Sequence, residues 1–190
     1  NCFALSEALD GAGKGYGIVF GVIMGTGVGG GIVINGQLCP GRQHICGEWG
    51  HNILEVDGPD CYCGQKGCVE TLISGPGLAG DFYRSGGNSV LTASDIVLQA
   101  AQGNSVAEVT MQRFFDRFGR ALATVVNILD PDVIVLGGGL SKIERLYSEG
   151  REKVAQYVFN DQLITPILQN LHGDSSGVRG AAQLWEVSEL

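Results

Sequence analysis

Three cysteines and one histidine are spaced in a way that favours metal binding. Cys61, Cys63 and Cys68 follow the pattern C-x-C-x4-C, and His51 lies ten positions before the first of them. Three thiolates and one imidazole are ligands that zinc takes in closed tetrahedral sites, and glycines between the last two cysteines let such a loop fold back on itself. The spacing therefore predicts a structural zinc site made by these four residues.

Two other states of these cysteines stay open at this point. A disulfide is disfavoured because C-x-C is too tight for easy pairing with itself. The sequence also shows no signal peptide that would indicate an oxidising compartment. We therefore expect a cytoplasmic protein in which the cysteines hold zinc or stay reduced without a metal. Cys2, Cys39 and Cys46 stand outside the pattern and are expected to be buried thiols.

Carboxylates flank the metal pattern at both ends. Glu48 precedes His51, and Glu70 follows Cys68. Carboxylates are good hydrogen-bond acceptors for hydroxyl groups, and an imidazole that gives one nitrogen to a metal keeps the other for a further hydrogen bond. We expect zinc to fix this loop so that Glu48, His51 and Glu70 face a polyol.

A first glycine-rich segment, Gly25–Gly31, is a candidate for binding phosphate. It follows the apolar run 18–24, which predicts a buried strand, and it is followed by a second short strand and an Asn-Gly turn. This order predicts an antiparallel meander with a glycine loop. Backbone N–H groups in such a loop and the hydroxyl of Thr26 can cradle phosphate oxygens, although most glycine hairpins simply turn the chain.

A second glycine-rich segment, Gly137–Gly139, follows the apolar strand predicted at 132–136. A helix is expected from Lys142 or Glu144. A strand, a glycine turn and a helix mark the place where nucleotides lie in open α/β sheets. A tight turn that needs small residues would give the same pattern.

The longest helical pattern covers residues 104–129, where apolar side chains recur at three- and four-residue steps. This face belongs to the core or to a subunit interface. Thr92, with Asp95 three positions later, has the pattern of a capping box. The other predicted elements are helices at 1–9, 70–73, 78–83, 96–101 and 151–159, a strand at 166–169, and a last helix capped by Ser175 or Ser176 that contains Trp185.

The totals exclude several classes of function. The chain has 190 residues, enough for one domain with a hydrophobic core, and a formal net charge of −8. An acidic chain without a basic stripe argues against nucleic-acid binding through this segment and against docking on anionic lipid. No apolar run approaches the length of a membrane span.

Two long motifs resemble one known family. G-E-W-G-H-N at residues 47–52 and C-Y-C-G-Q-K-G-C-V-E-T-L-I-S-G at residues 61–75 resemble the signature of the ROK family of sugar kinases and related repressors. The resemblance runs from Asn1 to the segment H-G-D-S-S-G-V-R-G-A-A, at residues 172–182. Within the family, the chain looks most like the bacterial fructokinases and N-acetylhexosamine kinases.

The resemblance implies an α/β fold of the ribonuclease H-like, actin-like ATPase kind, with a mixed sheet flanked by helices. Residues 1–190 would be the C-terminal lobe, with residues 48–70 as an inserted zinc loop and the N-terminal lobe outside this chain. The cofactors implied are structural Zn²⁺, ATP and Mg²⁺. Family members form dimers through a lobe of this kind, so we expect a homodimer that binds a sugar and ATP.

The resemblance also implies roles for single residues. The family's catalytic aspartate would stand two positions before Asn1, so no catalytic residue is expected in this chain, and the chain by itself is expected to lack kinase activity. The first glycine loop would face the ATP phosphates and the second would lie near the adenosine, through Gly25, Thr26, Gly27, Gly138 and Gly139.

Three functions remain as alternatives. The first is ATP-dependent phosphorylation of a hexose by the full-length parent; the motifs favour fructose over N-acetylglucosamine, glucose or mannose. The second is the sugar-sensing domain of a ROK transcriptional repressor, which would carry a helix-turn-helix upstream. The third is a zinc-stapled sugar-binding module without chemistry. The intact G-T-G-V-G-G-G segment favours the kinase.

Overall fold

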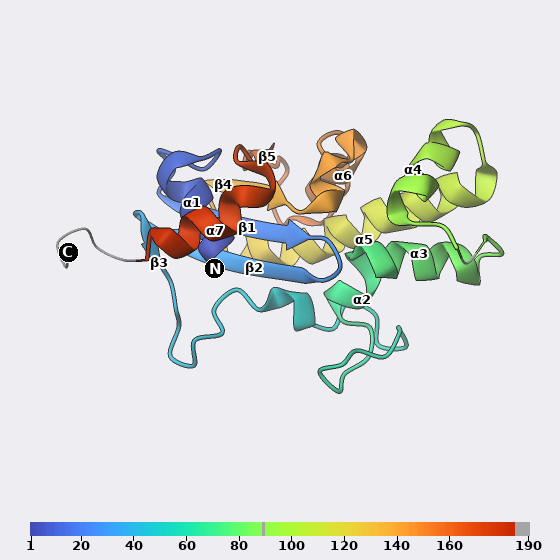
Figure 1. Cartoon of the computed structure of the whole chain (residues 1–190), viewed down its shortest axis with the longest axis horizontal. Helices are drawn as coiled ribbons and strands as arrows, with labels where there is room; N and C mark the ends of the chain where they lie inside the picture. Colours follow the sequence, from blue (N-terminus) through green and yellow to red (C-terminus); the bar gives the residue numbers. More distant parts are fainter. Residues whose placement is uncertain (89, 185–190) are drawn as a thin grey trace.

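A five-stranded mixed sheet forms the centre of the molecule (Figure 1). The computed structural model describes residues 1–88 and 90–184. The strand order is β3-β2-β1-β4-β5; β1, β2 and β3 are antiparallel neighbours, whereas β4 and β5 run parallel to β1. The strands are β1 (Ile18–Met24), β2 (Val28–Ile34), β3 (Gln37–Leu38), β4 (Val133–Gly137) and β5 (Ile167–Gln169).

Alternating side chains of the central strands serve two separate cores. On one face, Val19 and Val135 pack against α1 (Cys2–Asp10). On the other face, Phe20 and Ile134 belong to a larger core with α5 (Ser105–Leu129). Successive side chains of a strand point to opposite faces, so a strand buried on both faces is apolar throughout.

Helices cover both faces of the sheet and extend past its end. α7 packs on α1, while α3, α4 and the first part of α5 form a helical group beyond the carboxyl end of β1 (Figure 1). Among the described residues, no helix has both the length and the apolar character that crossing a membrane requires. The remaining helices are α2 (Val69–Ile73), α3 (Gly75–Arg84), α4 (Ala93–Ala101), α6 (Glu149–Tyr157) and α7 (Ser176–Ala182).

Several sequence predictions are confirmed to the residue. β1 has the predicted bounds, and α5 begins directly after Asn104, whose side chain accepts a hydrogen bond from the Ala107 amide at 3.1 Å. Thr92 and Asp95 form the predicted capping box, with each side chain bonded to the other residue's backbone N–H. Local caps and unbroken periodicity are therefore reliable markers in this chain.

The prediction that Gly25–Gly31 forms a loop is wrong beyond Gly27, because β2 begins at Val28. Two of the glycines within this strand have no room for a side chain. A Cβ added to Gly30 would lie 2.7 Å from the Gly47 carbonyl oxygen, and one added to Gly31 would lie 2.9 Å from Ala4 Cβ. Gly30 and Gly31 therefore serve close packing, whereas a Cβ on Gly29 would meet nothing within 4 Å.

The helix predicted from Leu78 begins earlier, at Gly75. Ser74 caps it by accepting a hydrogen bond from the Gly77 amide at 3.1 Å. Pro76 lies in the first turn, where a helix needs no amide donor. The Ser-Gly-Pro-Gly sequence therefore ends α2 at Ile73, as the predicted helix at 70–73 implies, and also starts α3.

The helix predicted from Lys142 or Glu144 is absent from this part of the described chain. Two short 3-10 turns, Gly139–Lys142 and Glu144–Leu146, occupy the place, and α6 begins only at Glu149. Side chains compete here for backbone acceptors, since the Ser141 hydroxyl donates to the Gly138 carbonyl and the Tyr147 hydroxyl donates to the Ser141 carbonyl.

Neither serine caps the last helix with its side chain. Ser175 holds the N-cap position, but its hydroxyl donates to the His172 carbonyl, while the Ser176 hydroxyl donates to the Glu7 carboxylate at 2.7 Å. The predicted inclusion of Trp185 in this helix lies outside the described residues.

The cysteines outside the metal pattern are less buried than expected. Cys2, Cys39 and Cys46 are all half-buried. The prediction of buried thiols is wrong for Cys39 and Cys46 because they flank an irregular segment after β3, residues 40–45, in which every residue is exposed.

Candidate functional site

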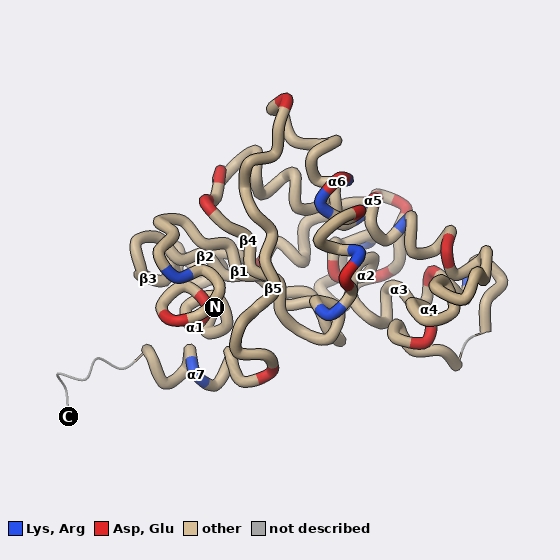
Figure 2. Tube along the Cα trace, turned by 90° about the horizontal axis from the view of Figure 1, so that it is seen from above, with Lys and Arg blue, Asp and Glu red and all other residues tan. Residues whose placement is uncertain are grey.

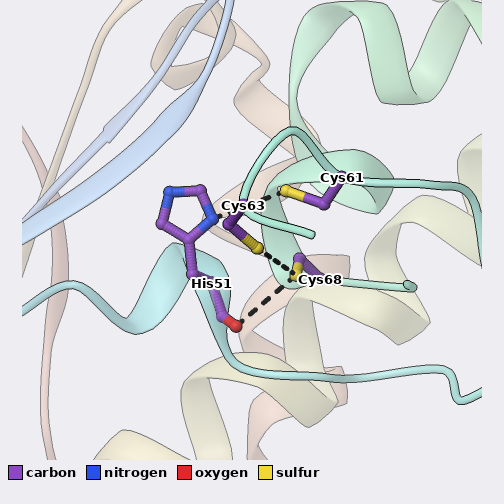
Figure 3. A group of neighbouring side chains, drawn as sticks. All are labelled: His51, Cys61, Cys63 and Cys68. Carbon is purple, nitrogen blue, oxygen red and sulfur yellow. Dashed lines mark hydrogen bonds between the residues drawn. The ribbon is translucent and has the colours of Figure 1, made fainter. Parts of the chain in front are cut away.

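The four predicted metal ligands converge on one point (Figure 3). One donor atom from each of His51, Cys61, Cys63 and Cys68 lies within 4.8 Å of all the others. Cys63 Sγ is 3.6 Å from Cys68 Sγ, and His51 Nδ1 is 3.5 Å from Cys61 Sγ. Tetrahedral zinc with its usual bond lengths separates two sulfurs by about 3.8 Å, and a sulfur from a nitrogen by about 3.6 Å. The donor set therefore fits zinc in both chemistry and size.

Backbone contacts shape the loop that carries the cysteines. Gly67 has a φ of +63° and accepts a hydrogen bond from the Leu54 amide at 2.8 Å. A Cβ on Gly67 would lie 1.6 Å from the Glu55 carbonyl oxygen, so this position requires glycine. Cys68 is the N-cap residue of α2, and His51 ends a 3-10 turn that spans Trp49–His51. Trp49 packs edge-on against Phe20.

The electrostatics of the cluster favour a cation. The Gln65 amide, followed by hydrogen bonds from the neighbouring donors, lowers the pKa of the Cys63 thiol to about 7. Burial and the two neighbouring sulfurs raise the pKa of Cys68. A cluster that readily forms one thiolate but resists further negative charge gains most from a bound metal ion, which lets the other thiols ionise.

His51 uses its two ring nitrogens in different directions. Nδ1 faces the sulfurs, whereas Nε2 lies 2.9 Å from the Tyr62 hydroxyl. With a metal on Nδ1 the neutral ring carries its proton on Nε2, which then donates outward. Tyr62 is 84% exposed, and its ring meets the His51 ring edge-on. Sequence analysis missed Tyr62, although its position between two predicted ligands was a usable signal.

Glu70 links the cysteine loop to the glycine hairpin. Its Oε2 accepts a hydrogen bond from the Val28 amide at 2.9 Å, and a Cβ on Gly27 would lie 2.5 Å from the same oxygen. Glu70 also lines a cavity of about 290 Å³ together with Thr26 and Tyr62. Glu70, one of the three residues expected to face a polyol, therefore lines a cavity of a size that suits a polyol.

Glu48 lies on a different, smaller hollow. This hollow, of about 130 Å³, is also lined by Asn1 and Gly30. Glu48 is still close to the His51 side of the site. Partial loss of water and then the negative charge of Glu70, the thiols and Glu48 raise the pKa of Tyr62. Both predicted carboxylates therefore act on Tyr62 through their charge, although they line different hollows.

The two glycine segments meet at one edge of the sheet. β1 and β4 are parallel neighbours, so their carboxyl ends lie together, and Gly25, Thr26 and Gly139 line one cavity of about 410 Å³. Gly138 instead packs against β1, with a φ of +80° and a Cβ position 2.4 Å from the Met24 carbonyl oxygen. Gly27 contacts Glu70. Three of the five predicted nucleotide residues line the cavity, and the other two shape its walls.

An ion-pair network fastens the cysteine loop to α5, and sequence analysis missed it. In Figure 2, basic and acidic positions lie near one another around the labels α5 and α2. Arg117, whose side chain is 11% exposed, makes two hydrogen bonds to the Glu55 carboxylate, at 2.8 and 3.1 Å. It also pairs with Asp81 of α3 at 3.1 Å, and Arg120 adds a third hydrogen bond to Glu55. One buried guanidinium therefore joins three segments around the site.

A profile of the ROK family matches residues 1–188. The chain belongs to the ROK family. An N-acetyl-D-glucosamine kinase from Yersinia pseudotuberculosis is 41% identical over 97% of this chain and 64% of its own length. The chain thus spans about two thirds of the length of this curated ROK relative.

Solved ROK structures share the fold. A glucokinase from Streptomyces griseus, in complex with glucose and AMPPNP, has a TM-score of 0.87 at 28% identity and covers 97% of this chain and 65% of its own. A ROK family transcriptional regulator, a homologue of the E. coli MLC protein, has a TM-score of 0.82 at 26% identity over 95% of this chain and 48% of its own. The expected mixed sheet flanked by helices, of the actin-like ATPase kind, is confirmed.

Proposed function

We propose that this chain supplies the sugar-binding loop, a structural zinc site and part of the ATP site of an ATP-dependent hexose kinase. One observation carries this proposal. Thr26 and Pro76 line both the 410 Å³ cavity at the glycine segments and the 290 Å³ cavity beside Glu70. A kinase needs its nucleotide and its acceptor in adjoining spaces, because phosphoryl transfer depends chiefly on positioning and charge stabilisation.

Each of the two adjoining cavities has groups suited to its ligand. On the sugar side, Glu70 accepts a hydrogen bond from one hydroxyl, and His51 Nε2 donates to another that takes the place of the Tyr62 hydroxyl. Glu48 adds a further acceptor from its own hollow. On the nucleotide side, backbone N–H groups near Gly25 and the Thr26 hydroxyl meet the phosphates, and Gly139 lies toward the adenosine. Mg²⁺, when bound to the phosphates, would supply the positive charge that neutralises them.

Zinc would be held by His51 and the three cysteines and would keep the loop in shape, since four protein ligands leave no open position for chemistry. The ROK resemblance puts the catalytic aspartate two positions before Asn1. Asn1 and Glu48 line the same hollow, so a base at that place would enter the site beside Glu48. The base could then take the proton of the attacking sugar hydroxyl.

The substrate is proposed from the names of the relatives. The sequence motifs favoured fructose, but the relatives reported above are named for N-acetyl-D-glucosamine and glucose. We therefore propose an aldohexose or its N-acetylamino derivative, with N-acetyl-D-glucosamine first. The homodimer and the cytoplasmic location remain predictions.

An assay of the full-length parent tests the function. ADP release from ATP and Mg²⁺ is followed with N-acetyl-D-glucosamine, glucose, mannose and fructose in turn. We expect the first or second sugar to give the highest kcat/KM, and Glu70→Gln to raise the sugar KM at least tenfold, because a charged hydrogen bond contributes about 1.5–3 kcal/mol. Failure of every sugar to accelerate ADP release would overturn the kinase proposal.

A sugar-responsive regulator is the second candidate, favoured by the similarity to the ROK transcriptional regulator. A regulator would bind sugar through the same loop but would not turn over ATP. Sugar binding measured by calorimetry without any sugar-dependent ADP release would favour this candidate over the kinase.

A further inference from the structure

Two cysteines outside the metal cluster lie against each other at the base of the segment that leads to Glu48. The Cys46 thiol donates to Cys39 Sγ at 3.2 Å. Both residues are half-buried, and residues 40–45 between them are all exposed, so the pair lies at the protein surface. Nothing in the sugar or nucleotide assignments uses this pair, and the inference is independent of them.

Both ends of the intervening segment are anchored on β2. The Cys39 amide donates to the Ile32 carbonyl at 2.8 Å, which holds one sulfur at the strand. At the other end, Gly47 packs so closely on β2 that a Cβ there would lie 2.9 Å from the Gly30 carbonyl oxygen. The chain turns back between these points, with His44 at a φ of +58°. The fold itself therefore keeps the two sulfurs together, without help from the metal cluster.

The pair has the composition of a dithiol and not of a metal site. Among the described residues, the only group of three or more metal donors that converges is the one around Cys61. Two adjacent thiols without further ligands are suited to thiol–disulfide exchange. Sulfurs already in contact need only a small approach to bond, which makes closure of the internal link faster than capture of a second molecule.

We propose that Cys39 and Cys46 form a thiol–disulfide modification site that reacts with low-molecular-weight disulfides of the glutathione type. In the first step one cysteine thiolate attacks a sulfur of the reagent, and one glutathione thiolate leaves. In the second step the other cysteine thiolate attacks the protein sulfur of the mixed disulfide, and the second glutathione thiolate leaves. The two cysteine protons end on the two released thiols, so the reagent is reduced and the cysteine pair is oxidised.

The roles of the two sulfurs follow from their surroundings. Burial and the neighbouring Cys39 raise the pKa of Cys46, so its thiolate is scarce at neutral pH. Cys39 is therefore the attacking residue and Cys46 the resolving one. The bond closes a ring over residues 39–46, which restricts the surface segment directly before Glu48 and the metal-binding histidine.

Thiol mapping of the zinc-loaded parent protein tests the proposal. The protein is equilibrated with mixtures of reduced and oxidised glutathione, quenched with acid, alkylated and analysed by peptide mass spectrometry. We expect the peptides of Cys39 and Cys46 to become linked, with the loss of two hydrogen atoms and without retained glutathione. Zinc should stay bound, as reported by a chromogenic chelator, and cleavage within 40–45 by a protease should slow at least about fivefold.

Matched variants separate pairing from simple reactivity. In Cys46→Ser and Cys46→Ala, Cys39 should retain one glutathione, because no second thiol can release it. Cys2, half-buried and outside the pair, should never join an internal link. The proposal is overturned if Cys39 and Cys46 both remain alkylatable in fully oxidised glutathione, or if either one links instead to a cysteine of the metal cluster.

Discussion

The sheet and the segment from Trp49 to Cys68 are held in place by different forces. Strands β1 and β4 are buried on both faces, with side chains such as Val22 and Val135 fully inside. In the segment, Trp49 packs into the core and Leu54 packs against it, but Ile53 and Val56 face outward. The other attachments of the segment are polar: four metal-type donors, the carboxylate of Glu55, and backbone bonds at Gly67. The stabilisation that apolar burial gives does not depend on pH or on a bound metal, whereas the stabilisation from charged groups and metal ligands does.

The difference teaches where the site can be controlled. The glycine segments that would face a nucleotide belong to the sheet edge and share its stability. The side chains that would face a sugar belong to the polar segment or, like Glu70, to the short helix that it leads into. Conditions that loosen the segment should therefore affect the sugar before the nucleotide.

Loss of one metal ligand should give the largest difference between the response of the segment and the response of the sheet. Cys68→Ser removes a buried sulfur that no serine oxygen replaces well as a zinc ligand. We expect zinc affinity to fall by more than about 100-fold, beyond the 10–100-fold cost of changing an outer-shell partner. Sugar affinity should fall with it, while circular dichroism of the sheet and helices persists.

The readouts are zinc content after dialysis and sugar binding by calorimetry, with Cys2→Ser as the control cysteine. Chelator treatment of the wild type should reproduce the result. Unchanged sugar binding in folded, metal-free protein would show that the metal does not position the segment.

A core substitution should produce the reverse pattern. Leu122 of α5 is fully buried, and Leu122→Ala leaves a cavity that costs about 2–5 kcal/mol of unfolding free energy. Zinc affinity of the folded protein should stay within about twofold of the wild type, since Leu122 contributes no polar attachment to the segment. Urea denaturation and chelator competition measure the two quantities. A parallel loss of zinc affinity would mean that the two regions form one cooperative unit.

The sequence predicted local features of both regions and missed the contacts between them. The C-x-C-x4-C pattern predicted which sulfur donors converge because the three sulfurs lie in one short loop, and the β-branched run identified β1. The hydrogen bond from Val28 to Glu70 and the pairing of Arg117 with Glu55 join positions 42 and 62 residues apart. No local pattern shows which of many charged residues will meet after folding.

Glycine positions show the same limit from another side. The sequence correctly indicated that glycines mark close approach or unusual backbone, but it could not say which ones do so. Gly30, within a strand, has no room for a side chain because Gly47 packs on it, and Gly138 has none because it packs against Met24. Those neighbours come from other parts of the chain. The run of glycines, taken by itself, therefore predicted a loop where β2 lies.

Two glycines of the cysteine loop make a matched pair for testing how tightly the segment is built. Gly67→Ala would put a Cβ 1.6 Å from the Glu55 carbonyl oxygen, whereas a Cβ on Gly64 meets nothing within 4 Å. Both have positive φ, which costs an alanine about 1–2 kcal/mol. Only Gly67→Ala adds a steric cost, of about 1–3 kcal/mol. Zinc affinity by chelator competition should therefore fall more in Gly67→Ala, and equal losses would contradict the observed packing.

The ion pair of Glu55 should have the smallest effect and a defined pH dependence. Burial opposes ionisation of Glu55, but the hydrogen bonds and charges of Arg117 and Arg120 outweigh it and hold its pKa below the ordinary 4.5. A carboxyl with a lowered folded-state pKa stabilises the protein above its unfolded pKa, and this stability is lost as the pH falls through the folded pKa. Glu55→Gln should cost about 1–2 kcal/mol at neutral pH, since the pair is partly exposed.

The difference in unfolding free energy between wild type and Glu55→Gln should shrink as the pH falls below 4.5. Glu108→Gln is the control, because Glu108 pairs with Arg145 of the segment before α6 and makes none of the contacts that hold the cysteine loop. Arg145 lowers the pKa of Glu108 to about 2, so the difference in unfolding free energy between wild type and Glu108→Gln should also shrink in acid, and should keep shrinking down to about pH 2. Only Glu55→Gln should weaken zinc binding at neutral pH, because only Glu55 joins the cysteine loop to α5; equal zinc affinity in the two variants would mean that the metal alone fixes the loop.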